Sequence, residues 1–257
     1  MEISKLPEEC ISHVLSFTSP KDAVRSKLVS PLFRSAVDSD VVWEKFLPFD
    51  YKQIISQSTA TLNSMSKKDL YFHLCDHPII INDGNMSFAL EKASGKKCFM
   101  VGARGLSIIW GDTPAYWRWN SMSESRFSEV AKLRVVWWLD IKAKIETKIL
   151  SSQTTYVVYL VFKLTENMHG FDRRGVNLRV DFEGQEIEGE GITVFLDPSR
   201  NMSRERGDGW LETTMGEFFS DNGEDGAVIC SLKEVNNGNT KSGLIVEGIE
   251  IRPKVDR

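Results

Sequence analysis

Three tryptophans in one short stretch are the residues whose chemistry is easiest to name. Trp110, Trp117 and Trp119 lie within LSIIWGDTPAYWRW, the stretch that runs from Leu106 to Trp119. A flat indole face suits a pyranose ring, because the axial C–H side of the ring is apolar while its hydroxyl groups stay free to hydrogen-bond. The stretch therefore predicts a saccharide platform at the rim of a sheet. The alternative is that all three indoles fill a core, as large aromatic side chains usually do.

Two short extended segments must position these rings. Apolar residues alternate from Leu106 to Trp110, which predicts a strand, and a turn with glycine and proline follows. If the chain is extended again at Trp117, the indoles of Trp117 and Trp119 point to one face and Arg118 points to the other. The aromatic surfaces would then lie around a tight turn.

Composition limits the class of protein. The chain has 257 residues, of which 41% are hydrophobic and 26% are charged, and its formal net charge is -4. These values are typical of a globular protein with one large or two small domains. A nucleic-acid partner is not expected, because such a partner calls for a basic face that neutralises phosphates.

The cysteines and the apolar runs bear on the compartment. Cys10, Cys75, Cys98 and Cys230 are scattered without the close spacing of a metal or redox motif. The first residues do not read as a secretory signal, so we expect a reducing compartment, the cytoplasm or the nucleus. No apolar run approaches the length of a membrane span, and no membrane partner is expected.

The first fifty residues predict four short helices. Pro7 begins the first, Ser19-Pro20 and Ser30-Pro31 begin the next two, and Asp40 is expected to cap the fourth. A bundle this small cannot bury all of its apolar side chains, so part of its surface needs a partner. The side chains that we expect at or beneath that surface are Leu6, Pro7, Ile11, Leu15, Val29 and Trp43.

The same segment resembles a known module. LPEECISHVLSFTSPKDAVRSKLVSPLFRSAVDSDVVWEKFLP, from Leu6 to about Pro48, is similar to an F-box. The resemblance implies that the segment docks on the Skp-type adaptor of a cullin-RING ubiquitin ligase. It also implies that the six side chains named above lie on the docking face or support it.

A connector with mixed helix and strand signals follows, from residue 49 to residue 102. Ser66 and Asp69 have the spacing of a helix cap, and Ile79 to Ile81 and Cys98 to Val101 read as short strands. His73 and His77 are four residues apart, as two ligands on one helical face would be. No third ligand lies nearby, so we expect a solvated pair, no metal site and no cofactor.

From residue 103 to residue 257 the chain reads as strands between turns. We expect the segments 133–141, 156–164, 176–182, 192–196, 210–215, 227–232 and 244–251 to be strands. The arginine-rich loop, residues 197–209, is expected to rim a binding site. The fold class is therefore α+β multidomain: a helical module at residues 1–48, the connector, and an all-β sandwich or jelly roll.

This β region resembles the plant phloem lectins, the Nictaba-like or phloem protein 2 family. The matching stretches include ARGLSIIWGDTPAYWRW, SRFSEVAKLRVVWWLDIKAKIETKIL, TTYVVYLVFKLT, GDGWLETTMGEFF and VEGIEIRP. The resemblance implies a β-sandwich that binds N-acetylglucosamine oligomers or N-glycan cores without a metal. It implies sugar contacts at Trp110, Trp117, Phe219 and Glu234. Ala227 departs from the family pattern, because sugar-binding members carry an acid there.

An F-box joined to a lectin-like sandwich indicates a substrate receptor of a ubiquitin ligase, with a glycan or glycoprotein as its target. The alternative is the same adaptor with a sandwich that captures a protein surface, its tryptophans lying in the core. An enzyme is not expected, because no pair of carboxylates can be placed together and the sequence has no GxSxG, HExxH or phosphate-loop pattern.

Overall fold

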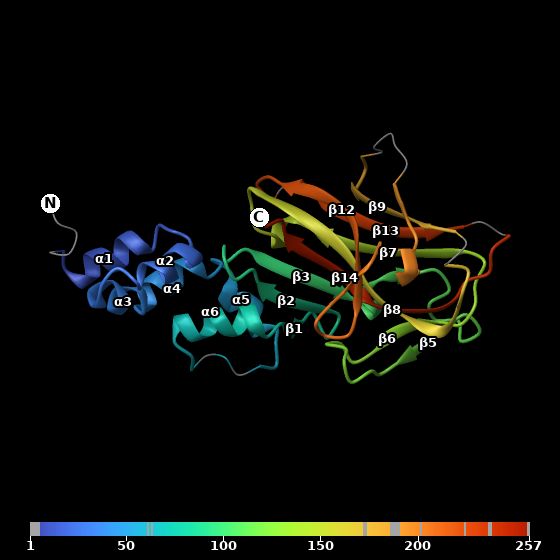
Figure 1. Ribbon diagram of the computed structural model, residues 1–257, viewed down its shortest axis with the longest axis horizontal. Coiled ribbons are helices and arrows are strands. Elements are labelled where there is room, and N and C mark those ends of the chain that lie inside the picture. Colours follow the sequence, from blue (N-terminus) through green and yellow to red (C-terminus); the bar gives the residue numbers. More distant parts are fainter. Residues whose placement is uncertain are drawn as a thin grey trace. The chain divides into compact units, whose positions relative to one another are not determined.

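The computed structural model describes residues 6–60, 62, 64–171, 174–185, 191–200, 202–223, 225–235 and 238–255. The chain divides into two compact units (Figure 1). The smaller unit comprises Met1–Asn82 and Phe88–Cys98, and the larger comprises Asp83–Ser87 and Phe99–Arg257. The predicted connector is thus shared between the two units. The predicted division at residues 48 and 102 stays a prediction.

Helices dominate the smaller unit. They are α1 (Glu8–Leu15), α2 (Pro20–Ser26), α3 (Pro31–Val37), α4 (Asp40–Phe46), α5 (Tyr51–Ser56) and α6 (Lys67–Asp76), and the strand β1 (Ile79–Ile81) follows them. The four predicted helices of the first fifty residues are confirmed, and α5 is an addition. Ser19 caps α2 by accepting the backbone N–H of Asp22 at 3.1 Å, and Ser30 caps α3 in the same way.

One predicted cap is wrong. Ser39, not Asp40, precedes α4 and accepts the backbone N–H of Val41 at 3.4 Å. Asp40 already belongs to the helix, and its carboxylate accepts the N–H of Lys67 at 2.9 Å, in the first turn of α6. The carboxylate therefore stabilises the beginning of a different helix.

Trp43 is the centre of the helical core. Its side chain is fully buried, and its indole N–H donates to the carbonyl of Val37 at 2.6 Å. Its ring lies 5.6 Å from the ring of Phe46 and 5.1 Å from that of Tyr71, measured between centroids. These contacts join α4 to α6, and they stabilise the short helices that could not form alone.

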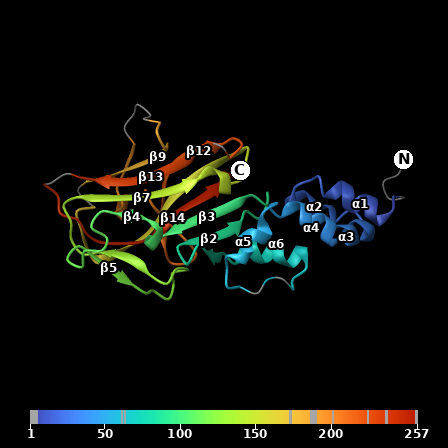
Figure 2. The same ribbon diagram turned by 180° about the vertical axis from the view of Figure 1, so that it is seen from behind.

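The larger unit is a sandwich of two antiparallel sheets (Figures 1 and 2), which confirms the predicted fold class. In the first sheet the strands follow the order β3 (Lys97–Gly102), β14 (Ser242–Pro253), β8 (Thr154–His169), β12 (Leu211–Ser220) and β11 (Arg204–Glu205). On the same sheet β6 (Val130–Leu133) pairs with β14, and β5 (Trp117–Asn120) pairs with β6. The strand β2 (Met86–Leu90) and β3 each contribute residues to both units.

The second sheet has the order β10 (Ile192–Val194), β9 (Val176–Phe182), β13 (Ala227–Glu234), β7 (Leu139–Glu146) and β4 (Ser107–Ile108). It packs against the first sheet through β9 and β12. The rings of Phe182 and Phe218 meet edge to face with centroids 6.0 Å apart. A Cβ atom at Gly216 would lie 3.0 Å from a methyl group of Val180, so the glycine permits this close approach.

The predicted strand 133–141 is wrong in its middle. β6 ends at Leu133 in the first sheet and β7 begins at Leu139 in the second, so the chain crosses from one sheet to the other between them. In this crossover, residues 134–138, Trp137 is 52% exposed and Trp138 is 40% exposed. Two exposed neighbours break the alternation that a half-buried strand requires.

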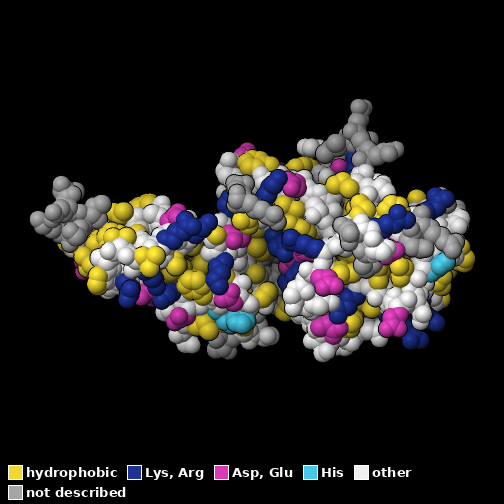
Figure 3. All heavy atoms as spheres, viewed as in Figure 1, with side chains coloured by type: hydrophobic (Ala, Val, Ile, Leu, Met, Phe, Trp, Pro, Cys, Tyr) yellow, Lys and Arg dark blue, Asp and Glu magenta, His cyan; other side chains and the backbone are white. Residues whose placement is uncertain are grey.

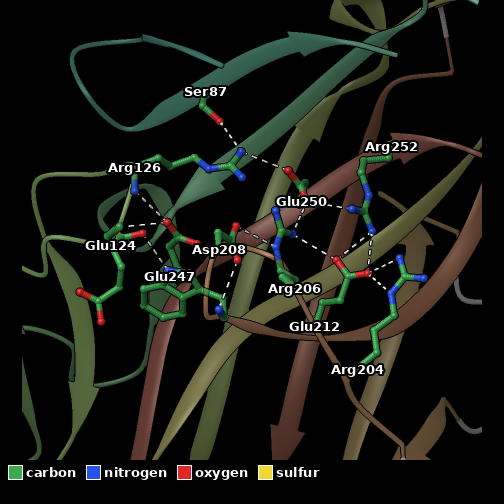
Figure 4. A network of polar contacts seen from close by, with 12 residues as sticks. Ser87, Glu124, Arg126, Arg204, Arg206, Asp208, Glu212, Glu247, Glu250 and Arg252 are labelled. Carbon is green, nitrogen blue, oxygen red and sulfur yellow. Dashed lines mark hydrogen bonds and ion pairs between the residues drawn. The ribbon is translucent and has the colours of Figure 1, made fainter. Parts of the chain in front are cut away.

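A network of arginines and glutamates lies on the first sheet (Figure 4), and two of its arginines come from the arginine-rich loop. Arg206 contacts Glu250 at 2.6 Å and Glu212 at 3.1 Å. Arg252 contacts Glu212 at 2.9 Å, and Arg126 contacts Glu250 at 3.1 Å. Both carboxylates are almost fully buried, so they depend on these guanidinium groups for compensation.

The same contacts set the protonation of Glu250. Burial by itself would raise the pKa of this carboxyl, but the positive charges of Arg126, Arg206 and Arg252 outweigh burial and hold the pKa below its ordinary value of 4.5. Glu250 is therefore ionised in the folded protein over a wider pH range than in the unfolded chain.

We expect acid to destabilise the larger unit through this residue. A carboxyl with a lowered pKa contributes stability above its unfolded pKa, and that stability is lost as the pH falls through the folded value. Urea unfolding followed by fluorescence, between about pH 3 and about pH 7, measures the free energy of unfolding. This free energy should fall more steeply with decreasing pH for the wild type than for Glu250→Gln. Equal slopes would contradict the role of Glu250. Glu217→Gln, at an exposed pair with Lys254, is the control.

Candidate functional site

Trp110 is presented by a turn after β4. Its side chain is 48% exposed, and its backbone has φ 56°, a left-handed conformation that large side chains rarely adopt. The turn is closed by hydrogen bonds from the N–H of Gly111 to Ile108 at 3.0 Å and from Thr113 to Trp110 at 2.9 Å. The indole lies 5.3 Å from the ring of Tyr116, measured between centroids. A flat aromatic surface is thus held at the protein surface.

Trp117 and Trp119 do not share this exposure. They lie on one face of β5 with Arg118 on the other, as the sequence predicts. However, Trp117 is only 2% exposed, because β5 pairs with β6 and turns this face toward the core. Trp119 is half-buried beneath the guanidinium of Arg104, 3.7 Å from its ring centre. Trp110 and Trp117, the two tryptophans at which the family resemblance implies sugar contacts, are therefore not exposed together.

Glu234 lies at the end of β13 and is also buried, with 8% of its surface exposed. Its carboxylate forms an ion pair with Lys241, whose side chain has no exposed surface. The ammonium of Lys241 also donates to the carbonyls of Trp137 at 2.5 Å and Asn239 at 2.8 Å. The carboxylate is therefore engaged inside the protein. A single lysine in a polar stretch carries no periodic signal of burial, so this partner of Glu234 could not be inferred from the sequence pattern.

Strand register places Trp110 and Glu234 at the same end of the second sheet. Glu234 pairs with Leu139, the first residue of β7. On the other side of β7, the N–H of Ile109 donates to the carbonyl of Asp140 at 3.1 Å. Trp110 is the next residue after Ile109, so it lies beside the same end of β7.

Phe219 belongs to the opposite end. It is 49% exposed near the end of β12. The next turn, residues 221–226, meets the far end of β7: the N–H of Thr147 donates to Gly226 at 2.9 Å. A strand of eight residues spans about 23 Å at the usual rise. The structure therefore brings Trp110 near Glu234 and leaves Phe219 and Ala227 at the far end.

The tryptophans of the crossover are exposed, although alternation in the sequence predicts a half-buried strand there. Trp137 and Trp138 directly precede Leu139, so their exposed rings lie at the same end of the second sheet as Trp110. We call the exposed rings of Trp110, Trp137 and Trp138, together with the half-buried ring of Tyr116, the aromatic end. Two consecutive tryptophans cannot both face inward on a half-covered strand, and that pattern in the sequence could have revealed them.

Among the described residues, no group of three or more His, Cys, Asp or Glu side chains is placed to hold a metal ion. The rings of His73 and His77 lie 5.0 Å apart on α6 and its end. In the same described part of the chain, no helix has the length and apolar character of a membrane span.

The side chains expected at the docking face divide into two groups. Ile11, Leu15 and Trp43 are 2%, 5% and 0% exposed, so they can only support the face from inside. Pro7 is exposed, Leu6 is half-buried and Val29 is 66% exposed.

Three further apolar side chains near this face, which were not expected from the sequence, are exposed: Val14 (58%), Phe17 (74%) and Leu28 (86%). Figure 3 shows hydrophobic side chains gathered over this part of the helices.

The fold is a module of short helices followed by a β-sandwich with an aromatic end, and the comparisons with known proteins identify both parts. Residues 96–253 match the model of the phloem protein 2 family, and residues 3–45 match that of the F-box domain. The chain belongs to the phloem protein 2 family and carries an F-box.

Two relatives are from Arabidopsis thaliana. F-box protein PP2-B10 is 45% identical, with 96% of this chain and 92% of the relative covered. Putative F-box protein PP2-B12 is 46% identical, with 99% of each chain covered. Among solved structures, a family 35 carbohydrate binding module from Clostridium thermocellum covers 60% of this chain and 96% of its own, with 11% identity and a TM-score of 0.34.

We expect Lys241→Met to lower the free energy of unfolding by about 3 to 5 kcal/mol, because it leaves the Glu234 carboxylate buried without its partner. Adding Glu234→Gln should restore part of that loss, since no buried charge then remains. Urea unfolding of both single variants and the double variant measures this coupling. Strictly additive losses would contradict it. Lys144→Met, which breaks an exposed pair with Glu183, should cost less than about 1 kcal/mol.

Proposed function

We propose that this chain is the substrate-recognition subunit of a cullin-RING ubiquitin ligase. The helices of the smaller unit dock on a Skp-type adaptor, and the β-sandwich captures the target. Ubiquitin transfer is then carried out by other subunits, and the chain is not itself an enzyme. The F-box match and the relatives named as F-box proteins support this proposal.

The observation that carries the adaptor proposal is the exposure of apolar side chains around α1 and α2. Leu28 is 86% exposed, Phe17 is 74% exposed and Val29 is 66% exposed. A contiguous apolar surface is costly in water and marks a site that a protein partner covers. The proposed face consists of Leu6, Pro7, Val14, Phe17, Leu28 and Val29, and Ile11, Leu15 and Trp43 keep its helices packed from within.

For the target, we propose a glycan that contains N-acetylglucosamine, bound over Trp110 and Tyr116, the part of the aromatic end that lies outside the crossover. Trp110 offers an exposed indole face beside Tyr116, which suits the apolar face of a pyranose. Trp117 and Glu234 act from beneath this surface and do not touch the sugar. Phe219 contributes only to a ligand that reaches the far end of the second sheet.

A second candidate is a protein target that is captured without a sugar. The burial of Trp117 and the ion pair of Glu234 favour it, because two of the expected sugar contacts are then engaged in the core. The exposure of Trp137 and Trp138 supplies an apolar surface of the kind that protein interfaces use. In this candidate the crossover, and not Trp110, makes the central contact.

We expect the double variant Leu28→Asp, Val29→Asp to lose adaptor binding while the chain stays folded. Two carboxylates would be desolvated in the complex, whereas both side chains are exposed in the free protein. Co-purification with a Skp-type adaptor and isothermal titration measure the binding, and circular dichroism measures folding. Val41→Asp, at a residue 56% exposed on α4, is the control that adds a charge elsewhere on the unit. Undiminished binding by the double variant would refute the proposed face.

We expect Trp110→Ala to weaken binding of an N-acetylglucosamine oligomer about 10-fold or more, and Trp137→Ala to leave it nearly unchanged. Titration calorimetry and a glycan array measure this difference. The protein-target candidate gives the opposite pattern: target capture depends on Trp137 and survives enzymatic removal of the glycans. An array with no bound glycan would refute the sugar proposal and leave the adaptor proposal intact.

A further inference from the structure

A polar groove of about 430 Å³ lies on the first sheet, away from the residues assigned above. Its lining includes Arg118 and Asn120 of β5, Lys132 and Arg134 at β6, and Thr165 and Asn167 of β8. Neither Trp110, Glu234 nor Phe219 lines it. The groove is therefore a feature that the proposed function does not use.

The charged side chains that line this groove are all positive. Arg118, Lys132 and Arg134 line it, and among the described residues no acidic side chain does. None of these three cations has an ion pair among the described residues, although Arg134 donates to the carbonyl of Pro114 at 2.8 Å. Other cations of the same sheet are paired, such as Arg252 with Glu212 and Lys163 with Glu124. In a chain with net charge -4, three unpaired cations in one groove indicate a site for an anion.

The strand register strengthens this argument. Arg118 and Lys132 are directly opposite each other on β5 and β6. Like charges in opposite positions on neighbouring strands destabilise a sheet, since their side chains leave on the same face at short range. A bound anion between them would remove this repulsion. The pair is thus unfavourable in the empty groove and favourable in an occupied one.

The remaining lining favours a ligand rich in hydroxyl groups. Asn120, Asn167, Thr165 and Ser242 contribute amide and hydroxyl groups, which donate and accept hydrogen bonds. Gly243 lies in the groove, where a Cβ atom would be 2.5 Å from the hydroxyl of Thr165, so the glycine keeps this place open. Leu133 is the one apolar side chain that the described part of the chain contributes to the lining. Peptides that carry phosphate also need apolar anchors, so a saccharide fits better.

We propose that this groove binds an acidic saccharide, a short sugar chain that carries carboxylate or phosphate groups. Arg118, Lys132 and Arg134 contact the anionic groups, and the amides and hydroxyls from β5, β8 and β14 contact the sugar hydroxyls. The site is independent of any neutral glycan at Trp110. If the groove binds no acidic saccharide, the proposed function is therefore unaffected. If Trp110 binds no neutral glycan, the proposal for the groove is likewise unaffected.

The test uses the full chain and three probes: trigalacturonic acid, glucose 6-phosphate and cellotriose, a neutral sugar. Titration calorimetry should detect one or both acidic sugars and no cellotriose. Arg118→Gln and Lys132→Gln should each weaken the acidic sugar about 10-fold, the loss of one charge-assisted contact. Lys148→Gln, at an exposed cation outside the groove, and Trp110→Ala should leave that affinity unchanged. Carboxylate and phosphate recognition are distinguished by which acidic sugar binds.

Thermal unfolding supplies a second readout that does not require a ligand. Because Arg118 and Lys132 repel each other, Lys132→Gln should raise the midpoint of unfolding while it removes acidic-sugar binding, whereas a purely structural cation would lower the midpoint. The proposal is overturned if no acidic sugar binds, if cellotriose binds equally well, or if the Arg118 and Lys132 variants bind like the wild type. Tighter binding of a phosphorylated peptide than of either acidic sugar would also overturn it.

Discussion

The ion pair of Lys241 with Glu234 is the interaction on which the larger unit depends most. The lysine is fully buried, and it satisfies its ammonium with one carboxylate and the carbonyls of Trp137 and Asn239. It thereby joins the end of β13, the crossover between the sheets and the beginning of β14. A buried ammonium tolerates no loose arrangement, because each missing partner leaves an uncompensated charge. The position of the aromatic end follows from this constraint.

Charges are used in three ways on this sandwich. The Glu212 and Glu250 network is buried and compensated by arginines, and it stabilises the first sheet. The Lys241 pair fixes the junction between the sheets. In the groove beside β5 and β6, by contrast, the cations have no carboxylate among the described residues. Compensated charges stabilise the fold. An uncompensated cluster of cations is a place where a ligand can supply the negative charge.

The chain separates adaptor docking from target capture. Short helices leave apolar side chains exposed because a bundle of this size has more of them than it can bury. The sandwich needs no such partner, since its two inner faces cover each other. Its surface features lie instead at strand ends, where turns such as that of Trp110 are free of the sheet register and can present a ring in a left-handed conformation.

Much of the candidate site could not be read from the sequence. Trp110 and Trp117 are both tryptophans that the sequence pattern places in extended segments, yet one is 48% and the other 2% exposed. The difference arises because β5 pairs with β6, a contact between segments that local periodicity does not describe. The sequence pattern places the crossover tryptophans in a strand for the same reason: alternation is a local pattern, whereas a change from one sheet to the other depends on distant segments.

By itself the sequence determined the helices with serine caps and first-turn prolines, most of the strands, and membership of the F-box and phloem protein 2 classes, because these depend on neighbours along the chain. Only the tertiary structure decided which side chains are free to bind. Burial, the partner of Glu234, and the meeting of Arg118 with Lys132 depend on residues brought together from distant segments, and hydrophobic patterning fixes a face without fixing what covers it.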